Sequence, residues 1–277
     1  MSPRCRLRID LAYDGSGFAG LARQPEQRTV QGELEAALSA LLGHHVRSVV
    51  EGRTDRGVHA SAQVVHVDVS PPDERRAARL DDLELLRGRL GHLLGPEVAV
   101  LAVRAVPPDF DARFSATARH YRYRLVDAEV ADPLRRHDRW AVGQHLDLSA
   151  MRVAARPLVG EHDFAAFCRR APGRTTVRRL DVLALSRPAP GRIDARLVGP
   201  AFCHQQVRAI VGCLVEVGRG RRPAGWVAEV LAGRDRARAA PLAPPHGLTL
   251  ERVAYGRRWP AAEAPWPGAD RGPGRRG

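Results

Sequence analysis

The first element of the expected fold is the stretch Cys5-Arg6-Leu7-Arg8-Ile9-Asp10-Leu11-Ala12-Tyr13. Every second side chain is apolar or weakly polar, and charged side chains lie between them over most of the stretch. Successive side chains of a β-strand point to opposite faces of a sheet, so this alternation predicts a half-buried strand. The arginines in and before the stretch also argue against the apolar run of a signal peptide.

The next hundred residues predict five further elements of one unit. Thr29 has the side chain of a helix N-cap, an apolar stripe follows it, and Gly43 has the residue type that ends a helix. The remaining elements are expected as strands at residues 46–50 and 63–69, a helix over 83–93 after Asp81 and Asp82, and a strand at 98–106. The order strand–helix–strand–strand–helix–strand is the ferredoxin-like arrangement.

The second half of the chain repeats this order of elements, although its residues show no repeat of the first half. Its elements are expected at residues 118–127 (strand), 148–159 (helix), 163–168 (a short segment), 177–186 and 192–198 (a hairpin), 203–217 and 226–231 (helices) and 248–255 (strand). We therefore expect an α+β fold in which two ferredoxin-like (βαββαβ) halves share a central mixed or antiparallel sheet, with an active-site cleft between them. The expected domains are residues 1–109 and 110–259, and the Pro-, Gly- and Arg-rich tail 260–277 is expected to be disordered.

Composition favours a polyanionic partner. The chain has 277 residues and a formal net charge of +13, from 44 basic and 31 acidic residues, and every basic residue is arginine. This excess predicts a positive surface suited to nucleic acid. No stretch approaches the ~20 apolar residues of a membrane helix. The four cysteines are widely spaced and form no C-x-x-C pair, which argues against a zinc site. A soluble protein in the reducing cytoplasm is expected.

Residues 52–60 read Gly-Arg-Thr-Asp-Arg-Gly-Val-His-Ala and carry the main candidate for chemistry. Asp55 lies between Arg53 and Arg56, and two glycines bracket the group, as suits a tight loop. Neighbouring arginines favour an ionised carboxylate, which can serve as a nucleophile, a base or a metal ligand. The same residues also suit an ordinary polar turn with a surface ion pair.

Two other segments carry candidate binding residues. On the strand expected near residue 120, Tyr121 and Tyr123 share one face and Arg122 shares the other with its neighbouring arginine. Such tyrosines either stack on nucleobases or fill a core, and such arginines can hold phosphates. Arg208 lies at the margin of a helix stripe, where a partly buried arginine needs either a local glutamate or a carboxylate from across the cleft.

The hypothesis of a metal-dependent hydrolase rests on His59, His66 and Asp68. The last two share a strand face and have side chains that can ligate a metal ion. The spacing of the three matches no metal-site pattern, and a site needs three or more convergent ligands. We therefore expect no metal and do not favour a metal-dependent hydrolase.

Several segments together resemble the tRNA pseudouridine synthase A family. They are Tyr13-Asp14-Gly15, Gly20 with Arg23-Gln24, residues 29–35, 52–60, 63–66, 113–123 and 202–212, and a late stretch at 243–250. The resemblance implies two ferredoxin-like halves, a homodimer in which one tRNA contacts both subunits, and an isomerase that uses no cofactor or metal. The implied reaction converts uridine to pseudouridine at positions 38, 39 and 40 of the tRNA anticodon stem-loop.

The resemblance also assigns roles to four residues. Asp55 stands at the catalytic aspartate of the family, and Tyr121 stands at a tyrosine that stacks on the uracil. Arg208 matches the arginine that pairs with the aspartate, and Arg53 matches an arginine that helps to extrude the target base. A catalytically silent RNA-binding protein on the same scaffold is the alternative, and the intact set of Asp55, Tyr121 and Arg208 argues against it.

Three positions depart from the family pattern. Leu21 stands where the family usually has Trp, Arg56 replaces a small residue after the aspartate, and Gln206 replaces Met in the helix before Arg208. None of these changes removes a catalytic group. Arg56 adds bulk and charge beside Asp55 and is expected to influence kinetics or site preference.

Overall fold

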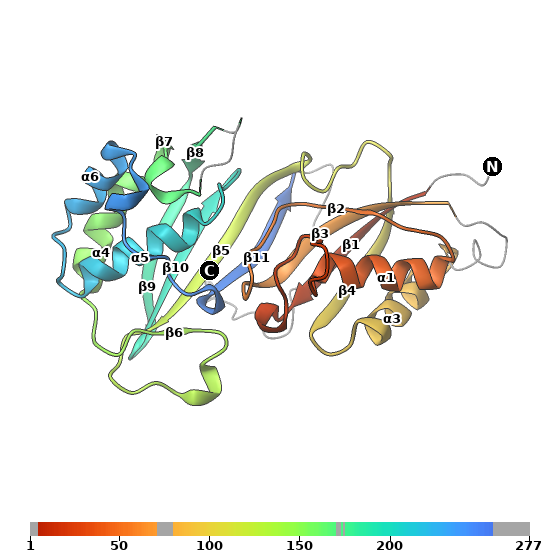
Figure 1. Ribbon diagram of the computed structural model, residues 1–277, viewed down its shortest axis with the longest axis horizontal. Helices are drawn as coiled ribbons and strands as arrows, with labels where there is room; N and C mark the ends of the chain where they lie inside the picture. Colours follow the sequence, from red (N-terminus) through yellow and green to blue (C-terminus); the bar gives the residue numbers. More distant parts are fainter. Residues whose placement is uncertain (1–4, 71–79, 170–172, 174, 257–277) are drawn as a thin grey trace, which may run out of the picture.

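The computed structural model describes residues 5–70, 80–169, 173 and 175–256. The molecule is elongated, with α1 and α3 at one end and α4, α5 and α6 at the other (Figure 1). The two long strands β5 and β11 run between these ends. The tail 260–277, which was expected to be disordered, lies outside the described residues.

The first half has the predicted order of elements. They are β1 (Cys5–Tyr13), α1 (Val30–Leu42), β2 (Ser48–Val50), β3 (His59–Val69), α3 (Leu83–Leu94) and β4 (Val98–Val106). The caps of α1 are those that the sequence predicts, because the Thr29 hydroxyl accepts the Gly32 N–H and Gly43 has a left-handed φ of 73°. Its strands lie in the order β4-β1-β3, with β2 paired to β3, and all of these pairs are antiparallel.

The second half repeats this spatial order. Its main elements are β5 (Ala116–Val126), β6 (Trp140–Ala141), α4 (Leu148–Ala155), β7 (Gly160–Asp163), β8 (Val177–Leu180), β9 (Val182–Ala189), β10 (Arg192–Gly199), α5 (Gln206–Gly218), α6 (Trp226–Gly233) and β11 (Leu248–Tyr255). Strands β11-β5-β10-β9 are antiparallel neighbours and correspond in order to β4-β1-β3-β2. The strand expected at residues 177–186 is split, because β8 pairs with β7 in a separate two-stranded sheet.

A short parallel contact joins the halves into one sheet. Strand β11 pairs with the start of β3 through Thr249 opposite His59 and Leu250 opposite Ala60. The shared central sheet that the sequence predicts is therefore confirmed, and it is mixed. This pairing also explains why β3 begins at His59 and not at residue 63, because the extra residues meet a strand from the other half.

Two hydrophobic clusters fill the two halves, and each includes residues from the other half. Leu250, Val253 and Tyr255 of β11 belong to the cluster of the first half. Val58, which directly precedes β3, belongs to the cluster of the second half. Tyr121 packs against both clusters. The junction is thus built by exchange of side chains, which fixes the residues around it. In the described part of the chain, no helix has the length and apolar character needed to cross a bilayer.

Candidate active site

The loop that carries Asp55 connects β2 to β3 and is fixed by hydrogen bonds within the first half. The Val58 N–H donates to the Asp55 carbonyl at 3.1 Å, and Gly57 has a φ of 77° that favours glycine. Next to Asp55, the Thr54 carbonyl accepts the Leu21 N–H at 3.2 Å, and the Thr54 hydroxyl lies 2.8 Å from the Tyr13 hydroxyl. These contacts fix the backbone of the loop and leave the Asp55 side chain to face the second half.

Arg208, in the first turn of α5, is the main partner of Asp55. Its Nη1 lies 2.7 Å from Asp55 Oδ2, and the two side chains are 13 % and 20 % exposed. Arg208 Nε also donates to the Ala243 carbonyl at 2.8 Å, so the guanidinium is held on two sides. The anion that Arg208 requires is therefore the carboxylate from the other half and not a local glutamate.

His204 supplies a second contact to the same carboxylate. Its Nε2 lies 3.2 Å from Asp55 Oδ1, and its side chain is 49 % exposed. Sequence reasoning did not assign this residue to the site. Its spacing of four residues before Arg208, about one helical turn, was the available signal.

The two tyrosines of β5 have different surroundings. Tyr123 is fully buried, and its hydroxyl donates to the Pro244 carbonyl at 2.7 Å, so it is a core residue. Tyr121 is half-buried at the junction, where its ring meets Phe202 edge-on with ring centres 5.1 Å apart. Burial raises the pKa of Tyr121, and the charges of Glu51 and Asp55 raise it further, so its phenol keeps its proton.

Comparison with known proteins places this chain in a family. A profile described as tRNA pseudouridine synthase matches residues 154–256. The chain is 51 % identical to the tRNA pseudouridine synthase A of Frankia casuarinae over 90 % of this chain and 89 % of the relative. It is 47 % identical to that of Streptomyces griseus, over 90 % and 88 %. The chain belongs to the tRNA pseudouridine synthase A family.

One further relative and one solved structure show lower similarity to this chain. The tRNA pseudouridine synthase A of Myxococcus xanthus is 42 % identical over 94 % of this chain and 95 % of the relative. The crystal structure of the archaeal box H/ACA sRNP Nop10-Cbf5 complex aligns with a TM-score of 0.32 and 10 % identity, over 76 % of this chain and 43 % of that chain. That structural likeness is too low to carry an argument, and the family assignment rests on the sequences.

Other arginines of this family member serve the fold. Arg122 is buried, and it contacts Glu251 at 2.6 Å and Asp194 at 3.4 Å. Arg124 donates to the Thr249 hydroxyl at 2.9 Å. Both are therefore engaged within the sheet, where the sequence pattern alone left open a contact with phosphate.

The two arginines that flank Asp55 differ in their contacts. Arg53 is exposed, and no described residue pairs with its guanidinium. Arg56 is exposed as well, and its Nη2 donates to Gln27 Oε1 at 3.0 Å. The added charge that distinguishes Arg56 from the family pattern is thus directed to a residue of the first half.

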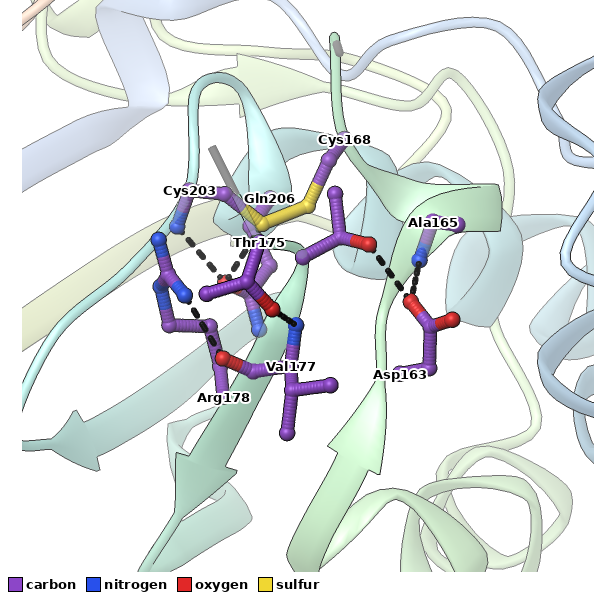
Figure 2. The surroundings of a disulfide bond; sticks show 9 residues. Asp163, Ala165, Cys168, Thr175, Val177, Arg178, Cys203 and Gln206 are labelled. Atoms are coloured by element: carbon purple, nitrogen blue, oxygen red, sulfur yellow. Dashed lines mark hydrogen bonds between the residues drawn. A yellow bond between two sulfur atoms is a disulfide. The ribbon is translucent and has the colours of Figure 1, made fainter. Parts of the chain in front are cut away.

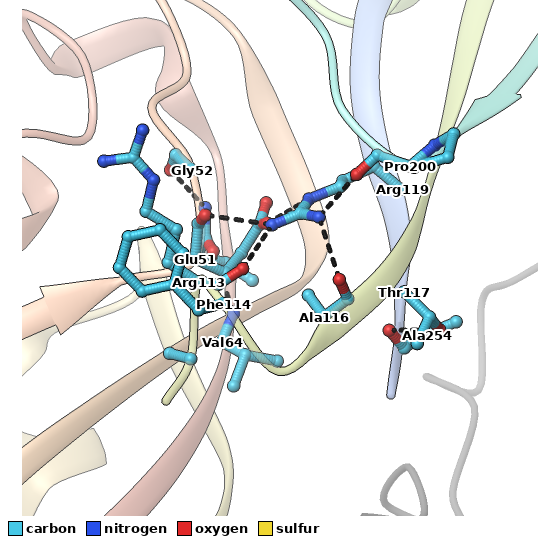
Figure 3. A network of polar contacts seen from close by, with 12 residues as sticks. Glu51, Gly52, Val64, Arg113, Phe114, Ala116, Thr117, Arg119, Pro200 and Ala254 are labelled. Atoms are coloured by element: carbon cyan, nitrogen blue, oxygen red, sulfur yellow. Dashed lines mark hydrogen bonds and ion pairs between the residues drawn. The ribbon is translucent and has the colours of Figure 1, made fainter. Parts of the chain in front are cut away.

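Glu51 and Arg119 form a buried ion pair at the start of the loop (Figure 3). Arg119 Nε lies 2.7 Å from Glu51 Oε2, and the side chains are 11 % and 1 % exposed. The other guanidinium nitrogens donate to the carbonyls of Glu51, Arg113, Ala116 and Pro200. Burial raises the pKa of Glu51 and the Arg119 guanidinium opposes that rise. The pair ties the loop to both halves, and sequence reasoning missed it because its members are 68 residues apart.

The three candidate metal ligands do not come together. His59 Nε2 lies 2.8 Å from the His137 carbonyl, and His66 Nδ1 accepts the Ala112 N–H at 3.0 Å. Asp68 forms a two-point ion pair with Arg6 at 2.7 Å. Within the described residues, no group of three or more His, Cys, Asp and Glu side chains is placed to hold a metal ion.

A disulfide joins Cys168 to Cys203, beside the start of α5 (Figure 2). This bond differs from what the reducing setting expected from the sequence would favour. Gln206, one of the departures from the family pattern, is buried, and its Oε1 accepts the Cys203 N–H at 2.9 Å. Leu21, another departure, is fully buried in the first cluster. These two departures therefore serve local packing and bonding.

Proposed function

We propose that this chain converts uridine to pseudouridine in tRNA, at positions 38, 39 and 40 of the anticodon stem-loop. Family membership supports the class of reaction. The observation that carries the assignment to particular residues is the Asp55 carboxylate, held by Arg208 from the opposite half at 2.7 Å.

The reaction is an isomerisation and needs no oxidant or reductant. The bond from N1 of the uracil to C1′ of the ribose breaks, the ring turns, and a bond forms from C5 to C1′. C5 loses its proton, and N1 gains one. The Asp55 carboxylate acts as the nucleophile that keeps the fragments together through a covalent intermediate, and the Arg208 guanidinium holds the carboxylate in place.

Tyr121 and Arg53 handle the base. Tyr121 stacks on the uracil and meets it as a neutral phenol, because its pKa is raised. Arg53 occupies the space that the target base leaves when it is extruded from the stem. The exposure of Arg53 and the lack of a partner among the described residues support this role.

The partner assignments follow from charge and family. The net charge of +13 supports binding to tRNA through its phosphates. We propose that the protein acts as a homodimer in the cytoplasm, without a cofactor or a metal, and that its domains divide near residue 109. Two separate hydrophobic clusters support two domains, with Leu250, Val253 and Tyr255 of the second domain packed in the first cluster.

The decisive experiment compares wild type with Asp55→Asn on a transcribed tRNA. Asp55→Asn should abolish pseudouridine formation and leave the Kd for tRNA within about threefold of wild type. Arg56→Ala is the matched control on the same loop and should stay active. Turnover of Asp55→Asn close to wild type would contradict the catalytic assignment. Wild-type protein that binds tRNA and forms no pseudouridine would favour the silent RNA-binding protein instead.

The substrate positions need a second experiment. Pseudouridines are mapped in tRNA from cells that lack this gene. We expect losses confined to positions 38, 39 and 40. Losses elsewhere in tRNA would leave the reaction class intact and refute the assigned positions.

A further inference from the structure

The Asp55 carboxylate is held at both oxygens by one short segment. Arg208 Nη1 contacts Oδ2 at 2.7 Å, and His204 Nε2 contacts Oδ1 at 3.2 Å. A single contact fixes one oxygen and leaves the carboxylate able to swing about it. Two contacts on different oxygens fix the plane of the group, which sets the direction in which it meets a substrate.

The two partners differ in how firmly they are held. Arg208 is 13 % exposed and is anchored to the Ala243 carbonyl as well as to Asp55. His204 is 49 % exposed, and Asp55 is the one polar partner of its imidazole among the described residues. The position of the His204 imidazole is therefore set mainly by the backbone around His204.

The backbone around His204 is tied down at three neighbouring points. The His204 carbonyl accepts the Arg169 N–H at 3.0 Å. Cys203 is bonded to Cys168, and its N–H donates to Gln206 Oε1 at 2.9 Å (Figure 2). The following residue, Gln205, has a left-handed φ of 68°, which turns the chain sharply before α5 begins. These features hold the segment that presents the imidazole to Asp55.

We propose that His204 is a positioning residue for the isomerisation. It acts through Asp55 by fixing the plane of the carboxylate, while the backbone contacts of residues 203–205 hold His204 in place. The inference rests on the proposed function and deepens it, because it assigns to this site a residue that needs no contact with the uridine. Loss of His204 is therefore expected to lower the rate of the chemical step and to leave the affinity for tRNA unchanged.

The test measures single-turnover rates on tRNA that carries tritium at C5 of its uridines, since pseudouridine formation releases that hydrogen to water. His204→Ala should lower the rate about 10-fold to 100-fold and leave the Kd for tRNA within about threefold. His204→Gln keeps an N–H donor on a side chain of comparable reach and should recover to within about fivefold of wild type. His92→Ala removes an exposed histidine from α3 and is the matched control, which should match wild type.

Three outcomes would overturn the proposal. One is a His204→Ala rate within about twofold of wild type. Another is a His204→Gln rate as low as that of His204→Ala, because the polar contact with Asp55 would then not be the cause. The third is a loss confined to the Kd, which would make His204 a tRNA contact. If wild type itself releases no tritium, the proposed function fails, so the two failures are distinguishable.

Discussion

Two arginine–carboxylate pairs lie on one short loop, one at its start and one at its tip, and have the same N–O distance. Arg119 lies 2.7 Å from Glu51 before the loop, and Arg208 lies 2.7 Å from Asp55 at its tip. In the first pair the side chains are 11 % and 1 % exposed, and the guanidinium nitrogens also bond four backbone carbonyls. In the second pair one carboxylate oxygen is left to the half-exposed His204.

The difference shows that contact distance alone does not separate scaffold from chemistry. A buried carboxylate surrounded by satisfied donors cannot reach a substrate, and it holds backbone segments together. The Asp55 carboxylate is partly exposed, so it can meet a substrate while Arg208 and His204 hold it. Removing an arginine from each pair should therefore damage different properties of the protein.

The largest effect is expected from Arg119→Met. It leaves the Glu51 carboxylate buried without its cation, and breaking a buried pair in this way costs about 3–5 kcal/mol of the free energy of unfolding. Urea denaturation measures this loss. The double variant Glu51→Leu/Arg119→Met removes the stranded charge and should regain most of the stability. A single variant as stable as wild type would show that the buried pair does not hold the halves.

Arg208→Met should act mainly on catalysis. Loss of the fixed cation beside Asp55 is expected to lower the single-turnover rate about 10²-fold to 10³-fold, as for removal of one preorganised charge-stabilising group. Its free energy of unfolding should fall by less than that of Arg119→Met, because water reaches the partly exposed Asp55. Equal losses of stability in the two variants would erase the proposed distinction.

The pH dependence of the Arg119→Met variant should identify Glu51 as the stranded charge. Burial already raises the pKa of Glu51 in wild type, and loss of Arg119 should raise it further. A carboxyl with a raised folded-state pKa is most favourable below its unfolded pKa of about 4.3, and that stability is lost as pH rises through the folded-state pKa. Arg119→Met should therefore lose less free energy of unfolding, relative to wild type, at about pH 5 than at pH 8. The difference should be about 1.4 kcal/mol for each unit by which the variant raises the pKa of Glu51 above its wild-type value. A deficit that is constant with pH would exclude Glu51 as its cause.

The smallest effect is expected from Arg56→Ala. Arg56 is exposed and bonds the side chain of Gln27, so its loss should change the free energy of unfolding by less than about 0.5 kcal/mol. Turnover should remain, with a change in rate or in preference among the three uridine positions. Complete inactivity in the tritium-release assay would place Arg56 within the catalytic group.

Sequence reasoning succeeded where the cause of a structure is local. Thr29 and Gly43 bound α1 as predicted, because a helix cap is formed by residues within one turn. Alternating apolar residues identified strands such as β1 and β3, and the order of elements along the chain predicted the ferredoxin-like strand order of both halves. It failed where the cause comes from far along the chain: β3 starts at His59 because β11 pairs there, and the strand expected at 177–186 divides because β7 pairs with its first part.

The candidate site shows the same division. Asp55 and Arg208 were predicted as partners from the resemblance, and their contact is present. Glu51, Arg119 and His204 were not identified, because nothing near them in sequence shows that an acid, a base or a ring will have a partner in the other half. A lone buried glutamate has no recognisable pattern until its distant arginine is placed beside it.

The exchange of side chains across the junction has a consequence for synthesis of the protein. Asp55 meets Arg208 only after 153 further residues have been added, and the first cluster lacks Leu250, Val253 and Tyr255 until β11 has left the ribosome. Contacts of such long sequence separation form late, because the entropy of closing the intervening chain must be overcome first. A nascent chain can therefore complete neither its first core nor its catalytic pair early, and an isolated first half would expose the edge of β3 that β11 normally covers. Activity should appear in a single step, when nearly the whole chain is available to fold.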